Sequence, residues 1–141
     1  MRYAKNMRLL GYWLDVDDDA TINYPEPQDL VDDSWLEGER ELLASYLNPK
    51  QNTLGEWGFS WCRFECGITD EEMGSLAFTD GVWIWPQGLA HYIVEHGVTL
   101  PDVFVDHARS NGWKVPDYNE SWNTRDIDPS IWIEWAKTKK A

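Results

Sequence analysis

Two cysteines and two histidines are the residues of this sequence best suited to chemistry. Cys62 and Cys66 have three residues between them, and after 24 more residues the chain supplies His91 and His96. Thiolate and imidazole groups are common ligands of tetrahedral zinc, and four protein ligands leave no coordination position open for catalysis. The pattern therefore indicates one structural zinc ion as a cofactor. The alternative is a site without metal, in which two buried, reduced cysteines lie near hydrogen-bonded histidines.

The spacing of the two histidines argues against a shared metal. We predict that His91 and His96 lie on one helix, where positions five apart are separated by about 140° around the axis. Positions four apart would share a face. A distorted helix end near Gly97 would be needed to bring both imidazoles to one ion. A disulfide is not expected instead, because one between Cys62 and Cys66 would close a small, strained loop.

A catalytic cysteine is the second possibility that these residue types raise. Cys62 has the chemistry of a thiol nucleophile, with His91 or His107 as its base and Asp80 or Asp106 to orient the imidazole. The sequence contains no glycine-rich phosphate loop, no nucleophile elbow and no HExxH motif in support of catalysis. We therefore expect a protein that acts by binding, with no catalytic residues.

The negative charge of the chain is concentrated in one segment. The net charge is −13, and between positions 15 and 41 eleven acids face a single base, Arg40. Such a surface repels nucleic acid and anionic membranes, since phosphate binding requires Lys and Arg. We interpret it as an interaction patch for a basic protein partner, as in an immunity protein, an inhibitor or a mimic of DNA; the alternative is that the charge provides solubility alone. The acidic patch consists of Asp15, Asp17, Asp18, Asp19, Glu26, Asp29, Asp32, Asp33, Glu37, Glu39 and Glu41.

Part of the acidic patch has the spacing of an EF-hand calcium loop. The aspartates at 15, 17 and 19 match positions 1, 3 and 5 of the twelve-residue template, and Glu26 matches position 12. The template needs glycine where this chain has Ala20, and Pro25 and Pro27 prevent the exiting helix that should carry the last ligand. We therefore predict no specific calcium site.

The elements that would position these residues indicate an α+β fold in a single domain, 1–141. We predict a small antiparallel β-sheet, made of a strand near 58–66 and a hairpin around Asp80-Gly81. Both stretches are rich in aromatic and β-branched residues, and Gly81 can take the positive φ of a tight turn. Residues 1–14 fit either a strand or a short helix.

Three to four helices are predicted to cover this sheet. Their starts are marked by capping residues or proline, and their ends by glycine or by asparagine with proline or glycine. The expected helices lie over 32–48, 86–97 and 101–112 and from 128 onward, with an acidic loop at 15–31 and an irregular segment at 113–128.

The composition sets the class of the protein. A chain of 141 residues that is 43% hydrophobic is long enough to bury one core, and most of the ten tryptophans should lie there, with some left as interface anchors. No apolar run reaches the roughly 18 residues of a membrane span, and the N-terminal stretch lacks a signal-peptide pattern. We therefore expect a cytoplasmic protein with no membrane partner.

Three short motifs lie between positions 58 and 104. They comprise Cys62-Arg63, Cys66-Gly67, Thr79-Asp80-Gly81, Trp85-Pro86, Gly88-Leu89, His91-Tyr92, His96, Val98, Leu100-Pro101 and Phe104. This arrangement resembles a group of small uncharacterised bacterial proteins that share the pattern CRxCG, then TDG, then WPEGLxHYVxxHxVxLPxxF. The group has two residues between its cysteines and a glutamate at the position of Gln87, so this chain departs from it twice. The group has no assigned function, and the resemblance implies no activity.

Overall fold

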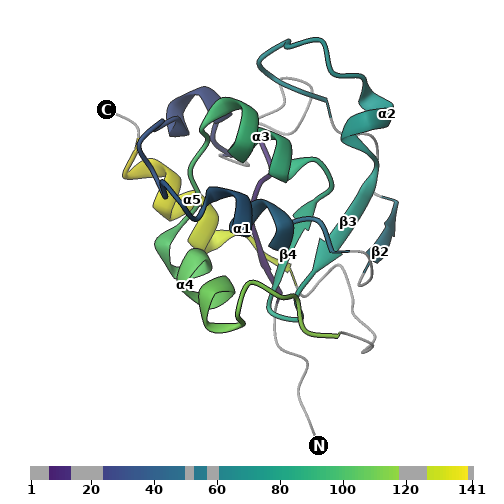
Figure 1. Ribbon diagram of the computed structural model, residues 1–141, viewed down its shortest axis with the longest axis vertical. Helices are drawn as coiled ribbons and strands as arrows, with labels where there is room; N and C mark the ends of the chain where they lie inside the picture. The colour runs from purple at the N-terminus through teal and green to yellow at the C-terminus, as the bar shows by residue number, and fades with distance from the viewer. Residues whose placement is uncertain (1–6, 14–23, 50–52, 57–60, 118–126, 140–141) are drawn as a thin grey trace, which may run out of the picture.

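The computed structural model describes residues 7–13, 24–49, 53–56, 61–117 and 127–139 (Figure 1). These residues form an α+β fold, which confirms the predicted class. Five strands make one mixed sheet in the order β2-β3-β4-β1-β5. The strands are β1 (Met7–Leu9), β2 (Thr53–Glu56), β3 (Leu76–Thr79), β4 (Trp83–Pro86) and β5 (Ile127–Asp128). The helices are the 3-10 helix η1 (Pro27–Leu30) and the α-helices α1 (Arg40–Tyr46), α2 (Asp70–Met73), α3 (Leu89–His96), α4 (Asp102–Ser110) and α5 (Ser130–Lys137).

The predicted hairpin around Asp80-Gly81 is confirmed. Strands β3 and β4 pair antiparallel, with Phe78 opposite Trp85. Gly81 has a φ of 92°, which only glycine adopts without strain. The Asp80 carboxylate accepts hydrogen bonds from the backbone of the turn, so the side chain fixes the conformation that glycine permits.

The sheet is mixed, whereas a purely antiparallel sheet was predicted. Strand β1 lies between β4 and β5 and runs parallel to both. Residues 7–9 therefore settle the open choice for the N-terminal segment in favour of a strand. Its position between two strands explains its burial: Met7 and Leu9 are each 5% exposed.

The strand predicted near 58–66 is wrong for the residues described, 61–66, which form a turn; positions 58–60 lie outside the described residues. Glu65 and Gly67 have φ values of 52° and 95°, and positive φ is incompatible with a paired strand. The strand that pairs with β3 at this edge is β2.

Three of the predicted helices appear as α3, α4 and α5, and the fourth is shorter than expected. α3 ends at Gly97, which takes a left-handed conformation with φ 65° as predicted. The helix expected over 32–48 is confined to α1, because Leu36 and Gly38 have positive φ and residues 33–39 form turns. The short helix α2, at the upper right of Figure 1, was not predicted.

The helices pack around a core rich in tryptophan. α1 contacts both α3 and α4, while α5 packs against β1. Trp83, Trp85 and Trp132 are each 0% exposed, and the indole N–H of Trp85 donates to the carbonyl of Leu47. Trp61, in contrast, is 45% exposed. Across the described part of the chain, no helix combines the length and apolar character required to cross a membrane.

Candidate metal centre

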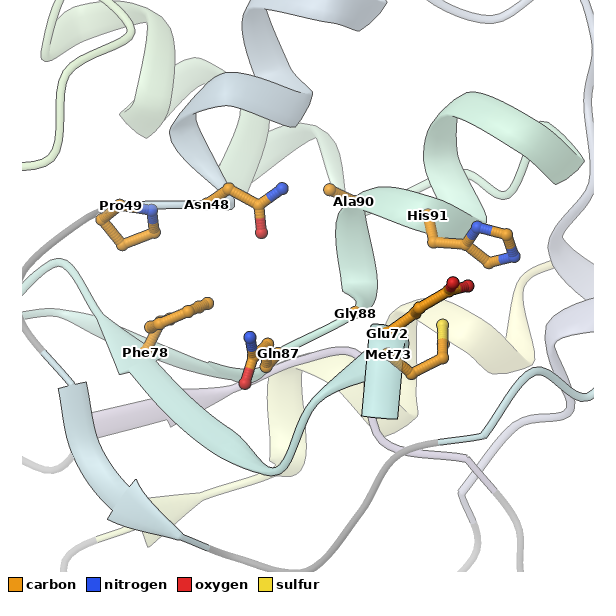
Figure 2. A pocket seen from close by; sticks show the side chains of 9 residues that line it. All are labelled: Asn48, Pro49, Glu72, Met73, Phe78, Gln87, Gly88, Ala90 and His91. Atoms are coloured by element: carbon orange, nitrogen blue, oxygen red, sulfur yellow. The ribbon is translucent and has the colours of Figure 1, made fainter. Parts of the chain in front are cut away.

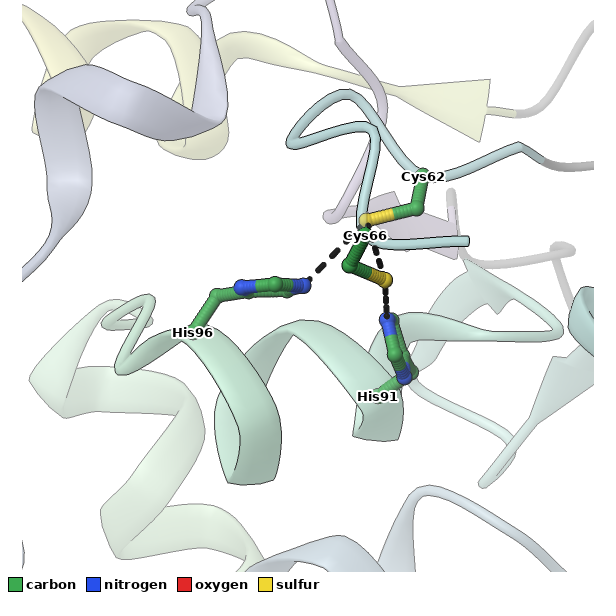
Figure 3. A group of neighbouring side chains, drawn as sticks. All are labelled: Cys62, Cys66, His91 and His96. Carbon is green, nitrogen blue, oxygen red and sulfur yellow. Dashed lines mark hydrogen bonds between the residues drawn. The ribbon is translucent and has the colours of Figure 1, made fainter. Parts of the chain in front are cut away.

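Cys62, Cys66, His91 and His96 come together between a loop and helix α3 (Figure 3). The loop, residues 61–67, supplies both thiols, and α3 supplies both imidazoles. Cys62 Sγ lies 3.3 Å from His96 Nε2, and Cys66 Sγ lies 3.3 Å from His91 Nε2. The two sulfur atoms are 3.6 Å apart. All four ligand atoms lie within 4.8 Å of one another.

These distances can be compared with those of a tetrahedral zinc site. Bonds of about 2.3 Å to sulfur and about 2.0 Å to nitrogen place two sulfurs about 3.8 Å apart and a sulfur and a nitrogen about 3.5 Å apart. The separations of 3.6 Å and 3.3 Å are both about 0.2 Å shorter. The group can therefore hold a metal ion with small adjustments of its side chains.

The spacing of five positions, which argued against a shared metal, does not keep His91 and His96 out of one cluster. His91 and His96 do leave α3 in different directions, but the cysteine loop lies over the stretch of helix surface between them. Their imidazoles approach the loop from two sides, with ring centroids 5.0 Å apart. His96 is also the last residue of α3, next to the left-handed Gly97. The loop, in meeting both side chains, removes the need for a shared helix face.

Tyr92 holds the loop against α3, and sequence analysis did not identify it as part of the site. Around the helix axis it lies between His91 and His96, since each residue advances by about 100°. Its hydroxyl donates to the carbonyl of Trp61 at 2.8 Å and accepts from the N–H of Arg63 at 3.0 Å. The place of a tyrosine between two candidate ligands on one helix is the sequence signal that could have identified it.

Further contacts fix the loop beside the ligands. The ring of Phe64 stacks on His96, with centroids 4.3 Å apart and an interplanar angle of 11°. Gln28 donates its side-chain amide to the carbonyl of Arg63 at 2.9 Å. The N–H of Glu65 donates to the carbonyl of Cys62 at 3.2 Å, which closes a tight turn and brings the two thiols to one side. The chain thus orients the ligands by contacts that are independent of any ion.

The protonation of the ligands is affected by their surroundings. Burial, followed by the charge of His96, lowers the pKa of His91 and favours the neutral imidazole, which is the form that binds metals. Burial also raises the pKa of the Cys62 thiol, partly offset by a hydrogen bond from the backbone of Phe64. A divalent cation at this place would favour the thiolate strongly enough to reverse that effect.

The centre lies at the protein surface. Cys62 is buried at 6% exposure, whereas Cys66 is exposed and both histidines are half-buried. A pocket of about 370 Å³ opens beside it, with Glu72 and Met73 of α2 on its wall (Figure 2). His91 also lines this pocket. Small solutes therefore reach the Cys66 and His91 side of the centre.

Of the groups considered for catalysis, the structure pairs His107 with Asp80, whereas Cys62 contacts His96. His107 lies on α4, with Nε2 3.3 Å from Oδ2 of the buried Asp80. Asp106 forms a surface ion pair with Arg109 at 2.8 Å. The cysteine and histidine pairs that are in contact are Cys62 with His96 and Cys66 with His91.

The acidic patch is described only in part. Asp15, Asp17, Asp18 and Asp19, with most of the EF-hand-like loop, lie outside the described residues. Five of the other members are exposed and two are half-buried, and one of these, Glu39, pairs with Arg109 at 3.0 Å. The exposed members are Glu26, Asp32, Asp33, Glu37 and Glu41, and the half-buried members are Asp29 and Glu39.

Comparison with known proteins gives no match to a protein family, to a curated protein or to a solved structure. The resemblance to the bacterial group therefore stays a prediction.

Proposed function

We propose that this protein binds one zinc ion through Cys62, Cys66, His91 and His96, and that the ion is structural. The observation that supports the proposal is the set of three contacts between ligand atoms, at 3.3, 3.3 and 3.6 Å, which lie close to the edges of a zinc tetrahedron. The two sulfur–nitrogen contacts join residues that are 34 and 25 positions apart in the chain. Simple hydrogen bonding would not require all four groups to meet.

The donor set favours zinc over other common ions. Two sulfurs and two nitrogens in a tetrahedral arrangement are typical of zinc, whereas magnesium and calcium prefer oxygen ligands. Four protein ligands fill the coordination shell, so the ion has no open position for a water or a substrate. A reducing compartment such as the cytoplasm would keep both thiols available for the metal.

The ion would fix the loop 61–67 on helix α3. That loop carries the exposed Trp61, whose ring lies under the guanidinium of Arg63 with 3.9 Å from its central carbon to the ring centroid. Trp and Arg are the residue types most enriched at binding hot spots. We therefore assign the zinc the role of holding a surface loop in one conformation.

The test is the metal content of protein purified without a polyhistidine tag. We expect close to one zinc per chain by plasma mass spectrometry, and a loss of affinity of at least about tenfold in Cys66→Ser and His91→Gln. His107→Gln is the matched control, because His107 lies on α4 away from the four ligands, and it should keep its zinc. Wild-type protein that neither contains zinc nor takes it up from a zinc buffer would refute the proposal.

The acidic patch supports a second proposal, that the protein binds a basic protein partner. Glu37 and Glu41 line a groove of about 350 Å³ with the exposed apolar side chain of Val94 on α3. The one base of the segment, Arg40, points its guanidinium at backbone carbonyls, with Nη2 2.6 Å from that of Trp35. Arg40 also lines the groove, so its two glutamates and one arginine leave a net negative charge beside an apolar surface, which suits a segment of alternating basic and aliphatic residues.

Ionic strength tests this second proposal. A complex formed at low salt should weaken steeply as salt is added, because exposed charges are screened. Glu37→Gln with Glu41→Gln should weaken it at low salt, whereas the same change of charge in Glu71→Gln with Glu134→Gln should have little effect. A complex that is insensitive to salt and to the first pair would exclude the acidic patch as its interface.

A further inference from the structure

The two thiols of the metal centre are placed to react with each other. Their sulfur atoms are 3.6 Å apart, and a disulfide bond requires about 2.05 Å, so they must close by roughly 1.5 Å. Both belong to one tight turn, closed by the hydrogen bond from the N–H of Glu65 to the carbonyl of Cys62. The loop that this disulfide closes is small and strained, and strained disulfides are readily reduced, which suits a reversible switch.

The thiols differ in their access to solvent. Cys66 is exposed, whereas only 6% of Cys62 is exposed. A small oxidant that approaches from solvent therefore meets the Cys66 sulfur first. The Cys62 sulfur lies directly behind it, in the position of a resolving thiol.

We propose that Cys62 and Cys66 form a peroxide-sensitive switch that releases the zinc. This inference rests on the proposed zinc site. The Cys66 thiolate attacks one oxygen of hydrogen peroxide, the O–O bond breaks, and the leaving hydroxide takes up a proton to become water. Cys66 is then a sulfenic acid.

The second step forms the disulfide. The Cys62 thiolate attacks the Cys66 sulfur, the S–O bond breaks, and the second hydroxide leaves and is protonated to water. Two thiolates have lost two electrons in total, and one peroxide has been reduced to two waters. The zinc ion loses both anionic ligands and dissociates, since His91 and His96 alone bind it weakly.

The hydrogen bonds of Tyr92 keep the loop near α3 when the zinc leaves, although the metal no longer fixes its conformation, and this makes the switch reversible. Both hydrogen bonds of the Tyr92 hydroxyl, to the carbonyl of Trp61 and from the N–H of Arg63, involve backbone groups that oxidation does not change. The stack of Phe64 on His96 is also independent of the thiols. Reduction of the disulfide therefore returns the two sulfurs to positions that face the imidazoles.

The experiment measures zinc, thiols and mass in the same sample. Zinc content of the untagged protein is determined first, and hydrogen peroxide is then added in the presence of a chromophoric zinc chelator. We expect one zinc released for each disulfide formed, a loss of two free thiols, and a decrease in intact mass of about 2 Da. A phosphine reductant followed by zinc chloride should restore the original zinc content.

Two variants sharpen the test. Cys62→Ser removes the resolving thiol, so the product should be a sulfenic or sulfinic acid, with a gain of about 16 or 32 Da and no intramolecular disulfide. Tyr92→Phe keeps the ring but removes the hydroxyl, so it should release zinc like the wild type and recover less of it after reduction.

The outcomes distinguish this switch from the zinc site on which it rests. Protein that contains zinc but keeps both zinc and thiols under peroxide would overturn the switch and leave the zinc site intact. Direct conversion to the sulfinic acid, without a disulfide, would also overturn it. Protein that never binds zinc would refute the metal centre itself, and the switch with it.

Discussion

The hydroxyl of Tyr46 donates a hydrogen bond of 2.6 Å to Oδ2 of Asp80. Both residues are buried, with 1% and 4% of their surface exposed. The other carboxylate oxygen, Oδ1, accepts from the N–H groups of Val82 and Trp83, and His107 Nε2 lies 3.3 Å from Oδ2. One carboxylate therefore joins helices α1 and α4 to the turn between β3 and β4.

The substitution Asp80→Asn should lower the free energy of unfolding by about 2–4 kcal/mol. An amide in this position removes the charge and directs a donor at the Tyr46 hydroxyl or at the backbone N–H groups of the turn. Urea denaturation followed by tryptophan fluorescence measures the change. Asp106→Asn is the control, because Asp106 pairs with Arg109 at the surface, and it should change stability by no more than about 0.5 kcal/mol. Equal effects of the two substitutions would contradict this account.

Removal of zinc should lower the free energy of unfolding, and the decrease should be larger the more tightly the ion was bound. An ion that binds only the folded state adds about 4 kcal/mol when its free concentration is a thousand times its dissociation constant. Thermal unfolding in a series of zinc buffers, with and without a chelator, should show a midpoint that rises with free zinc. His107→Gln should show the same dependence, whereas a midpoint of the wild type that ignores free zinc would argue against a structural ion.

The substitution Tyr92→Phe should lower the free energy of unfolding by about 1–3 kcal/mol. It leaves the carbonyl of Trp61 and the N–H of Arg63 without their partner, while the aromatic packing against Trp13 is retained. Zinc affinity should fall as well, because part of the binding energy must then order the loop. Competition with a chromophoric chelator measures that affinity. Unchanged affinity would mean that the loop is ordered without Tyr92.

Alkaline pH should destabilise the fold through its buried tyrosines. Burial is the main reason that the pKa of Tyr92 is raised to about 12, and burial beside Asp80 raises that of Tyr46. Their neutral forms are favoured in the folded state, so the stabilisation is complete below the unfolded pKa of about 10 and is lost as pH rises through the folded values. Absorbance at the phenolate band should show that some tyrosines of the native protein titrate well above pH 10. Tyr46→Phe should have one such tyrosine fewer than the wild type. Simultaneous titration of all tyrosines near pH 10 would contradict this.

The features that could be predicted from the sequence are those that depend on a residue and its immediate neighbours. Gly81 in a tight turn and Gly97 at a helix end both occupy the positive φ that their positions suggested. The types of the four candidate ligands were also sufficient to select them. These predictions needed only the conformational range of glycine and the chemistry of sulfur and nitrogen.

The remaining features depend on contacts between distant parts of the chain. The parallel position of β1 is set by its register with Trp83 and Ile127, far away in sequence. The turn at 61–67 has the alternation of a strand, but its backbone hydrogen bonds go to Tyr92 on a helix. The meeting of His91 with His96 depends on where that turn lies, so the angle around α3 alone could not predict it.

The place of β1 between two strands that come later in the chain has a consequence for the order in which the chain assembles. As the polypeptide leaves the ribosome, residues 7–9 can pair with a first strand only after β4 has been synthesised. The second partner, β5, is synthesised later still. Pairings over such separations carry a large loop-closure entropy and slow the approach to the native state. Until then the apolar side chains of Met7 and Leu9 are exposed to other nascent chains and to chaperones. They become buried once β5 and α5 have packed beside them.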